Sequence, residues 1–535
     1  MTWIDPKPLA FSAICLALPL PLAAKPPLSA SDWLSGTVEQ PEHQSGWRPG
    51  DPVPRAASQK KKSDLAPTGS VEPVGVTRLG EGNPDSKGTV SPKAAGLPSD
   101  LWGVSDGREL ARLVLAENPR LPATRRLLRR ILAAQLAPPS LQAPEAEGEL
   151  FLARVDKLLD MGATSAAQKL LHAAGPGAPE RFRRLFDISL LAGNEGAACE
   201  AMDRTPGIAP SFPARIFCLA ISGDWAAASL VQFGAEKLGR MEPATVRLLS
   251  HFLDDGYADT SEVLTPPAVI SPLTFRLHEA IGQPLPTSSQ PLAFALFDLS
   301  ENSGWKAQLD AAERLARAGA IPSSQLRDIY LLQAPAASGG VWDRVAAVQK
   351  VNDALTLRDA DKIAQTLPVA FDEMGKAGLD YALADMIGAE SAHFALTGRA
   401  GQIALWLALA AGQAQAVAEI PTAASDLDRW LLGFARGSSE PPPASVQEDP
   451  MVMDYFNAMT LPEQQALPEG PAALINDNRR GDALLQAIQN IDAGTDGDTH
   501  RAAQGMAVLR ALGQADIARQ AAIELILRPH MNGSG

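Results

Sequence analysis

The sequence predicts an all-α protein of the α-solenoid class, built from helical hairpins that stack along one direction. Two observations lead to this prediction. Residues 151–239 repeat one pattern three times, and a period of about 30 residues is typical of stacked supersecondary units. Aromatic residues make up only 5% of the chain, and Ala and Leu dominate its apolar content, which favours helix–helix packing over a β-sandwich.

The repeat is anchored on three glycines at intervals of 31 and 30 residues, namely Gly162, Gly193 and Gly223. A phenylalanine lies eleven positions before each glycine, and an alanine lies five positions after it. These residues are Phe151, Phe182 and Phe212 before the glycines, and Ala167, Ala198 and Ala228 after them. Apolar positions at helical spacing lead into each glycine, and a second helical run follows it. Each unit is therefore predicted to be a hairpin in which glycine permits a positive φ and alanine permits close packing.

The glycine with an alanine five residues later resembles the turn and small residue of tetratricopeptide repeats. The resemblance covers residues 151–239. The phenylalanine and the period, shorter than the usual length of about 34 residues, depart from that pattern, so the repeat is TPR-like. The resemblance implies a surface that binds other proteins, and it identifies no ligand.

Residues 1–24 are predicted to form a secretory signal peptide. The run 9–18 is apolar apart from Ser12, and 22–24 (Leu-Ala-Ala) fits a cleavage site. Because the run is too short to cross a bilayer as a helix, we expect export to the periplasm of a Gram-negative cell, with no transmembrane segment after cleavage. An uncleaved anchor and a mis-set start codon remain open as alternatives.

Residues 25–97 are predicted to be a disordered arm, because a chain rich in Pro, Gly, Ser and charge buries too little apolar surface to offset its entropy. Trp33 and Leu34 form an apolar pair within it, and 60–62 is a basic cluster. The pair is either a short motif that docks on a partner or part of a solvated linker. Trp33 is expected to be exposed to solvent.

Helical hairpins are expected over 98–436, the first helix starting at the capping-box spacing of Asp106 and Glu109. The next predicted helix, 124–136, has leucine and isoleucine on one face and four arginines on the other, Arg125, Arg126, Arg129 and Arg130. The arginines form either a docking face for an acidic partner or anionic head groups, or the solvated outside of a capping repeat.

Beyond residue 239 the repeat weakens, and a second boundary is expected near the C-terminus. Residues 437–450 contain three consecutive prolines and are predicted to be a linker. A smaller helical unit is predicted over 451–527, followed by a flexible tail, 528–535.

The sequence nominates no catalytic, cofactor or metal site. No two histidines or cysteines have metal-ligand spacing. Asn490, Asp492, Asp496 and Asp498 resemble a calcium loop, but Arg501 stands where the loop needs glutamate, so an acidic helix-capping loop is predicted. A net charge of −14 argues against general nucleic-acid binding.

Cys199 and Cys218 are the only cysteines of the expected mature chain. They lie on opposite sides of a proline-containing turn, on two helices predicted to be antiparallel. An oxidising periplasm permits a disulfide if their Cα atoms approach within about 7 Å. Two buried, reduced thiols are the alternative.

The favoured function is a non-catalytic periplasmic scaffold or adaptor that binds other envelope proteins. By analogy of layout, such a protein could serve an envelope machine such as the flagellar motor or its stator. The alternative is a hydrolase or transglycosylase that acts on cell-wall polymer from a helical superstructure. The sequence does not indicate the oligomeric state.

Overall fold

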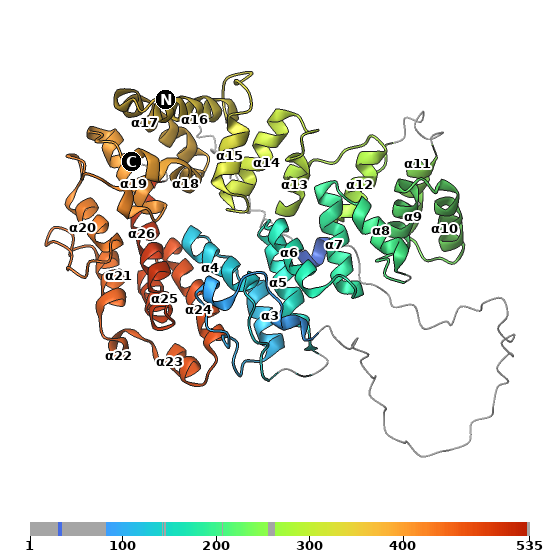
Figure 1. Ribbon diagram of the computed structural model, residues 1–535, viewed down its shortest axis with the longest axis horizontal. Coiled ribbons are helices and arrows are strands. Elements are labelled where there is room, and N and C mark those ends of the chain that lie inside the picture. The colour runs from blue at the N-terminus through green and yellow to red at the C-terminus, as the bar shows by residue number, and fades with distance from the viewer. Residues whose placement is uncertain are drawn as a thin grey trace, which may run out of the picture.

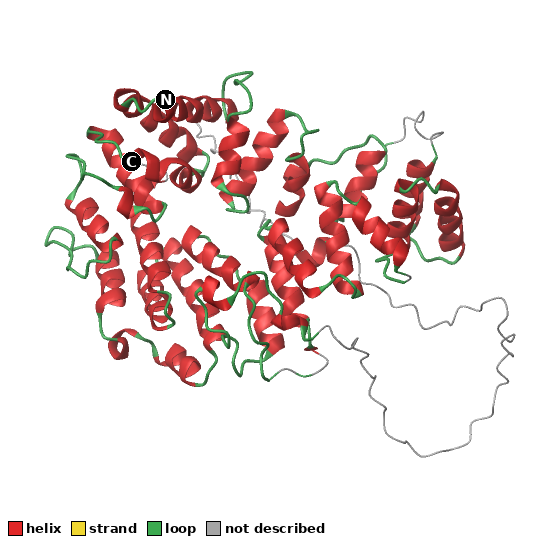
Figure 2. Cartoon of the chain, viewed as in Figure 1, coloured by secondary structure: helices red, strands yellow, loops and turns green. Residues whose placement is uncertain are grey.

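The structure is a computed structural model that describes residues 30–34, 82–141, 143, 146–205, 207–254 and 263–531. These residues form helices joined by turns, and within the described ranges no strand is present (Figure 2). The all-α prediction is therefore confirmed for this part of the chain. The predicted signal peptide, most of the arm with its basic cluster 60–62, and residues 532–535 lie outside the described residues.

The three predicted hairpins are present between residues 149 and 237. They are α5 (Glu149–Asp160) with α6 (Thr164–Ala174), α7 (Pro179–Ala192) with α8 (Gly196–Arg204), and α9 (Phe212–Ile221) with α10 (Trp225–Lys237). Gly162, Gly193 and Gly223 lie in the turns with φ of 69°, 66° and 88°. This is the left-handed conformation that only glycine adopts without strain.

Most anchor side chains of the repeat are buried, as the pattern predicts. The buried anchors are Phe151, Phe182, Ala167, Ala198 and Ala228. Phe212 differs, because it is the first residue of α9 and 44% of it stays exposed. The third unit therefore packs its N-terminal end less completely than the first two.

The remaining helices precede and follow these hairpins. Before them lie α1 (Ala30–Trp33), α2 (Pro92–Ala95), α3 (Gly107–Ala116) and α4 (Pro122–Ala133), with the 3-10 turn η1 (Pro84–Ser86). After them lie α11 (Pro243–Leu253), α12 (Pro272–Ala280), η4 (Thr287–Ser289), η5 (Leu292–Phe294), α13 (Ala295–Asp298), α14 (Trp305–Arg317), α15 (Ser323–Tyr330), α16 (Val341–Thr356), α17 (Ala360–Lys376), α18 (Asp380–Ser391), α19 (Gly398–Ala410), η6 (Ala414–Ala416), α20 (Asp426–Ala435), α21 (Pro450–Thr460), α22 (Glu463–Ala466), α23 (Glu469–Asn476), α24 (Arg480–Ala493), η7 (Gly494–Asp496), α25 (Thr499–Ala511) and α26 (Ala515–Met531).

The C-terminal helices return to the N-terminal ones instead of extending the row of hairpins. Helix α26 packs against α4, and α24 packs against both α3 and α4, so that the red and blue helices lie side by side in Figure 1. One continuous apolar core reaches from Ala30 to Met531. The predicted loop at 437–450 is present, but it does not divide two units, and the boundary drawn there is wrong.

A second apolar core belongs to α7–α12 alone. Helix α7 joins the two cores, because Leu185 and Leu191 face the large core while Phe186 and Leu190 face the small one. The tail also starts later than predicted: residues 528–531 continue α26, and Met531 is buried. Periodicity identified the helices, but it does not show which distant helices share a core.

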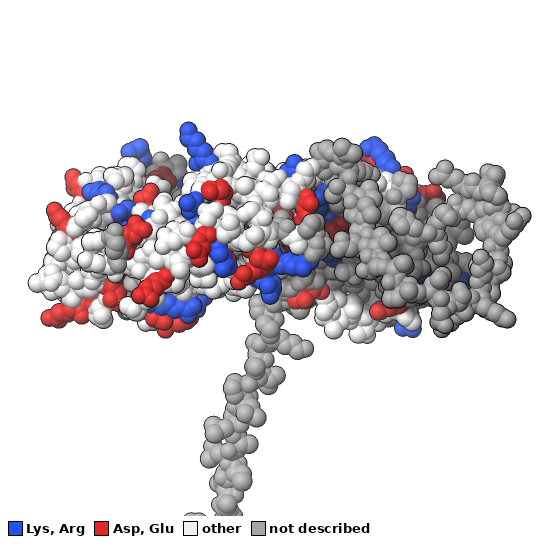
Figure 3. Space-filling view, turned by 90° about the horizontal axis from the view of Figure 1, so that it is seen from below, with Lys and Arg blue, Asp and Glu red and all other residues white. Residues whose placement is uncertain are grey.

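No helix among the described residues is long and apolar enough to cross a membrane. Where the described residues are visible in Figure 3, basic and acidic side chains are interspersed, without a stripe of a single sign.

Candidate functional site

The Trp33–Leu34 pair is buried in this chain's own core, and the expectation that Trp33 is exposed is wrong. Helix α1 packs against α5, and the Trp33 ring meets the Phe294 ring edge-on with centroids 5.4 Å apart. The amide N–H of Ala30 donates a hydrogen bond to the carboxylate of Asp160. The apolar surface that contacts Trp33 belongs to α5 and η5. The sequence of the arm itself therefore does not predict that Trp33 is buried.

The ordered chain also starts before the predicted boundary at residue 97. Asp85 accepts hydrogen bonds from the amides of Gly148 and Phe151, at 2.8 and 2.6 Å, and so caps the start of α5. The buried guanidinium of Arg154 donates to the carbonyl oxygens of Leu132, Ala134 and Asp85. Residues 82–97 therefore belong to the folded body, and the disorder predicted for them is wrong.

The four arginines of α4 all reach acceptors on neighbouring parts of the chain. Arg126 pairs with Glu524 at 3.1 Å, and Arg130 donates to the amide oxygen of Gln514 at 2.7 Å. Arg125 and Arg129 donate to the main-chain carbonyls of Arg317 and Gly319. These half-buried side chains join α4 to α26 and to the end of α14, and the Arg126 side chain stays 41% exposed.

The N-terminus of α4 is capped by carboxylates from the far end of the chain. Leu121, its N-cap, offers no side-chain cap. Glu524 instead accepts from the amide of Ala123 at 3.0 Å, and Asp492 accepts from the amide of Arg120 at 2.6 Å. Both carboxylates are buried, and desolvation raises the pKa of Glu524 to about 7. Helix N-termini stabilise negative charge, so the pairing is favourable, but its role is structural.

The acidic loop at 490–498 caps helices, as the sequence predicts. Asp498 accepts from the amide of Arg501 at the start of α25, and Asp496 binds the guanidinium of Arg120 at 2.6 and 2.7 Å. Across the described ranges, no group of three His, Cys, Asp or Glu side chains could hold a metal ion.

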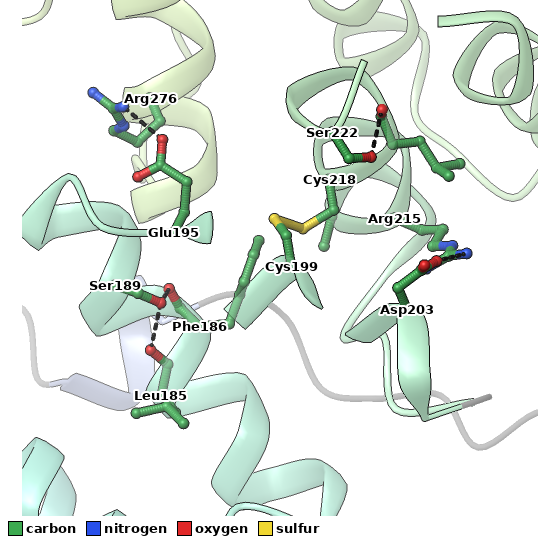
Figure 4. The surroundings of a disulfide bond; sticks show 12 residues. Leu185, Phe186, Ser189, Glu195, Cys199, Asp203, Arg215, Cys218, Ser222 and Arg276 are labelled. Atoms are coloured by element: carbon green, nitrogen blue, oxygen red, sulfur yellow. Dashed lines mark hydrogen bonds and ion pairs between the residues drawn. A yellow bond between two sulfur atoms is a disulfide. The ribbon is translucent and has the colours of Figure 1, made fainter. Parts of the chain in front are cut away.

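Cys199 of α8 and Cys218 of α9 form a disulfide in the structure, with Cα atoms 5.1 Å apart (Figure 4). Both residues are buried in the core of α7–α12. Nearby, Arg276 of α12 pairs with Glu195 at 2.9 Å, just before the first residue of α8. The disulfide and this ion pair hold the second and third hairpins and α12 together as one body.

Helix α10 and its C-cap residue Leu238 carry large apolar side chains that stay mostly exposed among the described residues, although Lys237 lies over the Phe233 ring. Leu230, Phe233 and Leu238 are 71%, 59% and 72% exposed. The opposite face of the helix packs on the protein through Ala228 and Ala235. The repeat pattern predicts α10 as the second helix of a hairpin but not an apolar outer face, which the helical spacing of Leu230 and Phe233 indicates.

Two of the cavities in the described part of the chain offer alternative sites. One, of about 460 Å³, lies between η4 and α14 and is lined by Glu279, Asp298, Asp310 and Arg314 among others. Burial raises the pKa of Asp298, which also accepts a hydrogen bond from the Thr287 hydroxyl. The other is a shallow groove of about 520 Å³ between α3 and α5, with Leu115 and Leu152 among the residues that line it.

Comparison of the chain with protein-family models, with curated proteins and with solved structures finds no match.

Proposed function

We propose that this protein is a non-catalytic, protein-binding scaffold of the bacterial envelope, in which TPR-like hairpins of a helical solenoid present an apolar helix face to a partner. The observation that carries the proposal is the exposed face of α10, on which Leu230 and Phe233 are more than half exposed while Ala228 and Ala235 pack on the body. Monomeric proteins rarely expose contiguous apolar patches of more than about a few hundred Å². Larger exposed patches usually mark interaction sites.

The support around α10 indicates that this face is preformed. Helix α10 packs along α9 and α11, and the disulfide fixes α9 to α8. Gln232 on the inner side donates to the hydroxyl of Ser250 at 2.8 Å and so ties α10 to α11. A preformed apolar face loses little conformational entropy when a partner binds.

A periplasmic location is part of the proposal. It is supported by the signal-like residues 1–24 and by the pairing of Cys199 with Cys218, because disulfides persist in oxidising compartments and are rare in the cytosol.

The test is affinity capture from envelope extract with the full chain and with Leu230→Glu and Phe233→Glu variants. We expect wild type to retain one or more proteins at a stoichiometric level and both variants to lose them, because a charge at the centre of an apolar contact is costly. Leu357→Glu is the matched control, since Leu357 is 66% exposed at the end of α16, far along the chain from α10. Equal capture by all variants contradicts the proposal.

The cavity between η4 and α14 favours a second candidate, an enzyme that cleaves cell-wall polymer. It brings together two carboxyl residues, Asp298 and Glu279, and the pKa of Asp298 is raised by burial, as a general acid in glycoside hydrolysis requires. Turnover of purified peptidoglycan by the full chain, abolished by Asp298→Asn, supports this candidate. Absence of turnover with wild type removes it.

A further inference from the structure

Helix α1 and the residue after it meet the body as a docked helical turn. Residues 35–81 separate this turn from Gly82, the next described residue along the chain. Its anchors are Ala30, Trp33 and Leu34, which are 0%, 1% and 5% exposed. They stand at positions i, i+3 and i+4, the spacing by which an amphipathic helix lies in the groove of a partner. The turn therefore has the form of a peptide bound to a protein.

The surface that holds the turn belongs to α5 and η5, and we call it the α5–η5 groove. Phe294 of η5 meets the Trp33 ring edge-on, with ring centroids 5.4 Å apart. Asp160, at the end of α5, accepts a hydrogen bond from the amide N–H of Ala30. The groove thus contacts both ends of the turn, one through an aromatic ring and the other through a carboxylate.

The walls of the α5–η5 groove are held by contacts that do not involve the turn. Helix α5 packs against α3, α4 and α6. The Phe294 ring lies edge-on to the Phe275 ring at 5.5 Å, and Lys157 pairs with Asp160 at 3.3 Å. We therefore expect the groove to keep its shape when the turn leaves, and a preformed groove loses little conformational entropy on binding.

The contact between the turn and the groove is also incomplete. The indole N–H of Trp33 is buried and has no hydrogen-bond partner. A buried donor that gives up water without gaining an acceptor weakens a contact. One aromatic anchor with an unpaired donor is therefore expected to dock reversibly.

We infer that residues 30–34 are a tethered ligand of this chain's own α5–η5 groove. The docked turn closes the groove to a helical turn of another polypeptide that carries a small residue, Trp and Leu at the same spacing. An attached ligand acts at an effective concentration that a separate peptide has to exceed. The groove lies in the large core and α10 in the small one, so the inference goes beyond the proposed function and does not depend on it.

The first experiment measures, by fluorescence polarisation, the binding of a labelled peptide of residues 28–36 to the full chain. Trp33→Ala weakens the attached ligand, so this variant should bind the peptide at least tenfold more tightly than wild type. Trp225→Ala is the matched control, because Trp225 is 48% exposed on α10, and it should bind as weakly as wild type. Equal binding by Trp33→Ala and wild type overturns the inference.

Two altered peptides test whether the peptide docks as residues 30–34 do. A peptide with Trp33→Ala lacks the aromatic anchor. One with Ala30→Leu carries a larger side chain where the buried alanine leaves no exposed surface. Both should bind the Trp33→Ala chain at least tenfold more weakly than the parent peptide. If all three peptides bind alike, the peptide does not occupy the groove in this way and the inference is wrong.

The second experiment leaves the docked residues unchanged. A specific protease site placed between residues 35 and 81 allows the link between the turn and the body to be cut. After cleavage, a hundredfold excess of the parent peptide should displace the fragment that contains residues 30–34, and size-exclusion chromatography should separate this fragment from the body. The Trp33→Ala peptide should leave it bound. A fragment that remains with the body in excess parent peptide is a fixed part of the core, which overturns the inference.

Discussion

The buried carboxyl of Glu117 should make the stability of the fold depend on pH. Glu117 ends α3 and is almost fully buried, with one oxygen accepting from the Gln489 amide at 2.9 Å and the other without a partner. Desolvation raises its pKa from 4.5 to about 8, and the neighbouring Asp492 adds to the rise. The hydrogen bond from Gln489 opposes it, as does the charge of Lys157.

The direction of this pH dependence follows from the protons that the folded and unfolded states bind. The folded state keeps the Glu117 proton at pH values where the unfolded chain has lost it, because the folded pKa is the higher one. The contribution to stability is therefore complete below about pH 4.5 and is lost as the pH rises towards about 8. Each pH unit in this window costs about 1.4 kcal/mol, so the loss between pH 5 and 7.5 is about 3 kcal/mol.

Glu117→Gln removes the titration while keeping an oxygen that can accept from Gln489. The free energy of unfolding of each protein is measured with urea at pH 5 and 7.5. Relative to wild type, the variant should be about 3 kcal/mol more stable at pH 7.5 than it is at pH 5. Glu301→Gln, at an exposed loop position, changes the formal charge equally and should give no such shift. If Glu117→Gln and wild type lose stability in parallel, the argument from burial is wrong.

Three further predictions concern the turns, the disulfide and the N-terminal segment. Gly162→Ala should destabilise the fold more than Gly193→Ala. Both glycines have positive φ, but a Cβ added at Gly162 lies 2.9 Å from the Leu292 side chain, whereas one added at Gly193 meets no atom. Equal urea midpoints for the two variants contradict this prediction. Replacing Cys199 and Cys218 by serine should lower the free energy of unfolding by about 3 kcal/mol, and alkylation of exported wild-type protein without reductant should label neither residue. Trp33→Ala should speed hydrogen exchange at the Ala30 amide, which Asp160 holds, and leave exchange in α24–α26 unchanged; unchanged exchange at Ala30 argues against docking of α1.

The hairpins of residues 149–237 could be predicted because their determinants are local. A glycine with positive φ, an alanine five residues later and a phenylalanine eleven residues before the glycine all lie within one helix pair. Gly193 shows this well, since its turn needs no distant contact to explain it. The all-α class follows from the same local periodicity.

The docking of Trp33 could not be predicted, because its environment is created by residues far along the chain. Phe294 lies more than 250 positions away, and Asp160 about 130. The sequence around a Trp-Leu pair in a polar segment does not indicate whether the pair stays exposed to solvent or packs between helices. The apolar face of α10 is the reverse case: it has the spacing of a buried helix, but it stays mostly exposed among the described residues.

Helix α4 shows why the sequence does not predict that the two ends of the chain pack together. Its arginine face looks solvated, but guanidinium groups have long apolar stems and several donors, so they can be buried where carbonyls and carboxylates accept their hydrogen bonds. Those acceptors are Glu524, Gln514 and the carbonyls of Arg317 and Gly319 at the end of α14. Helix α4 therefore depends on α26 for its cap and its packing, and the real organisation is one closed body with the α7–α12 unit attached to it. Hairpins that contain their own packing partners are therefore predictable from local sequence, whereas α4 is capped and packed by residues at the other end of the chain.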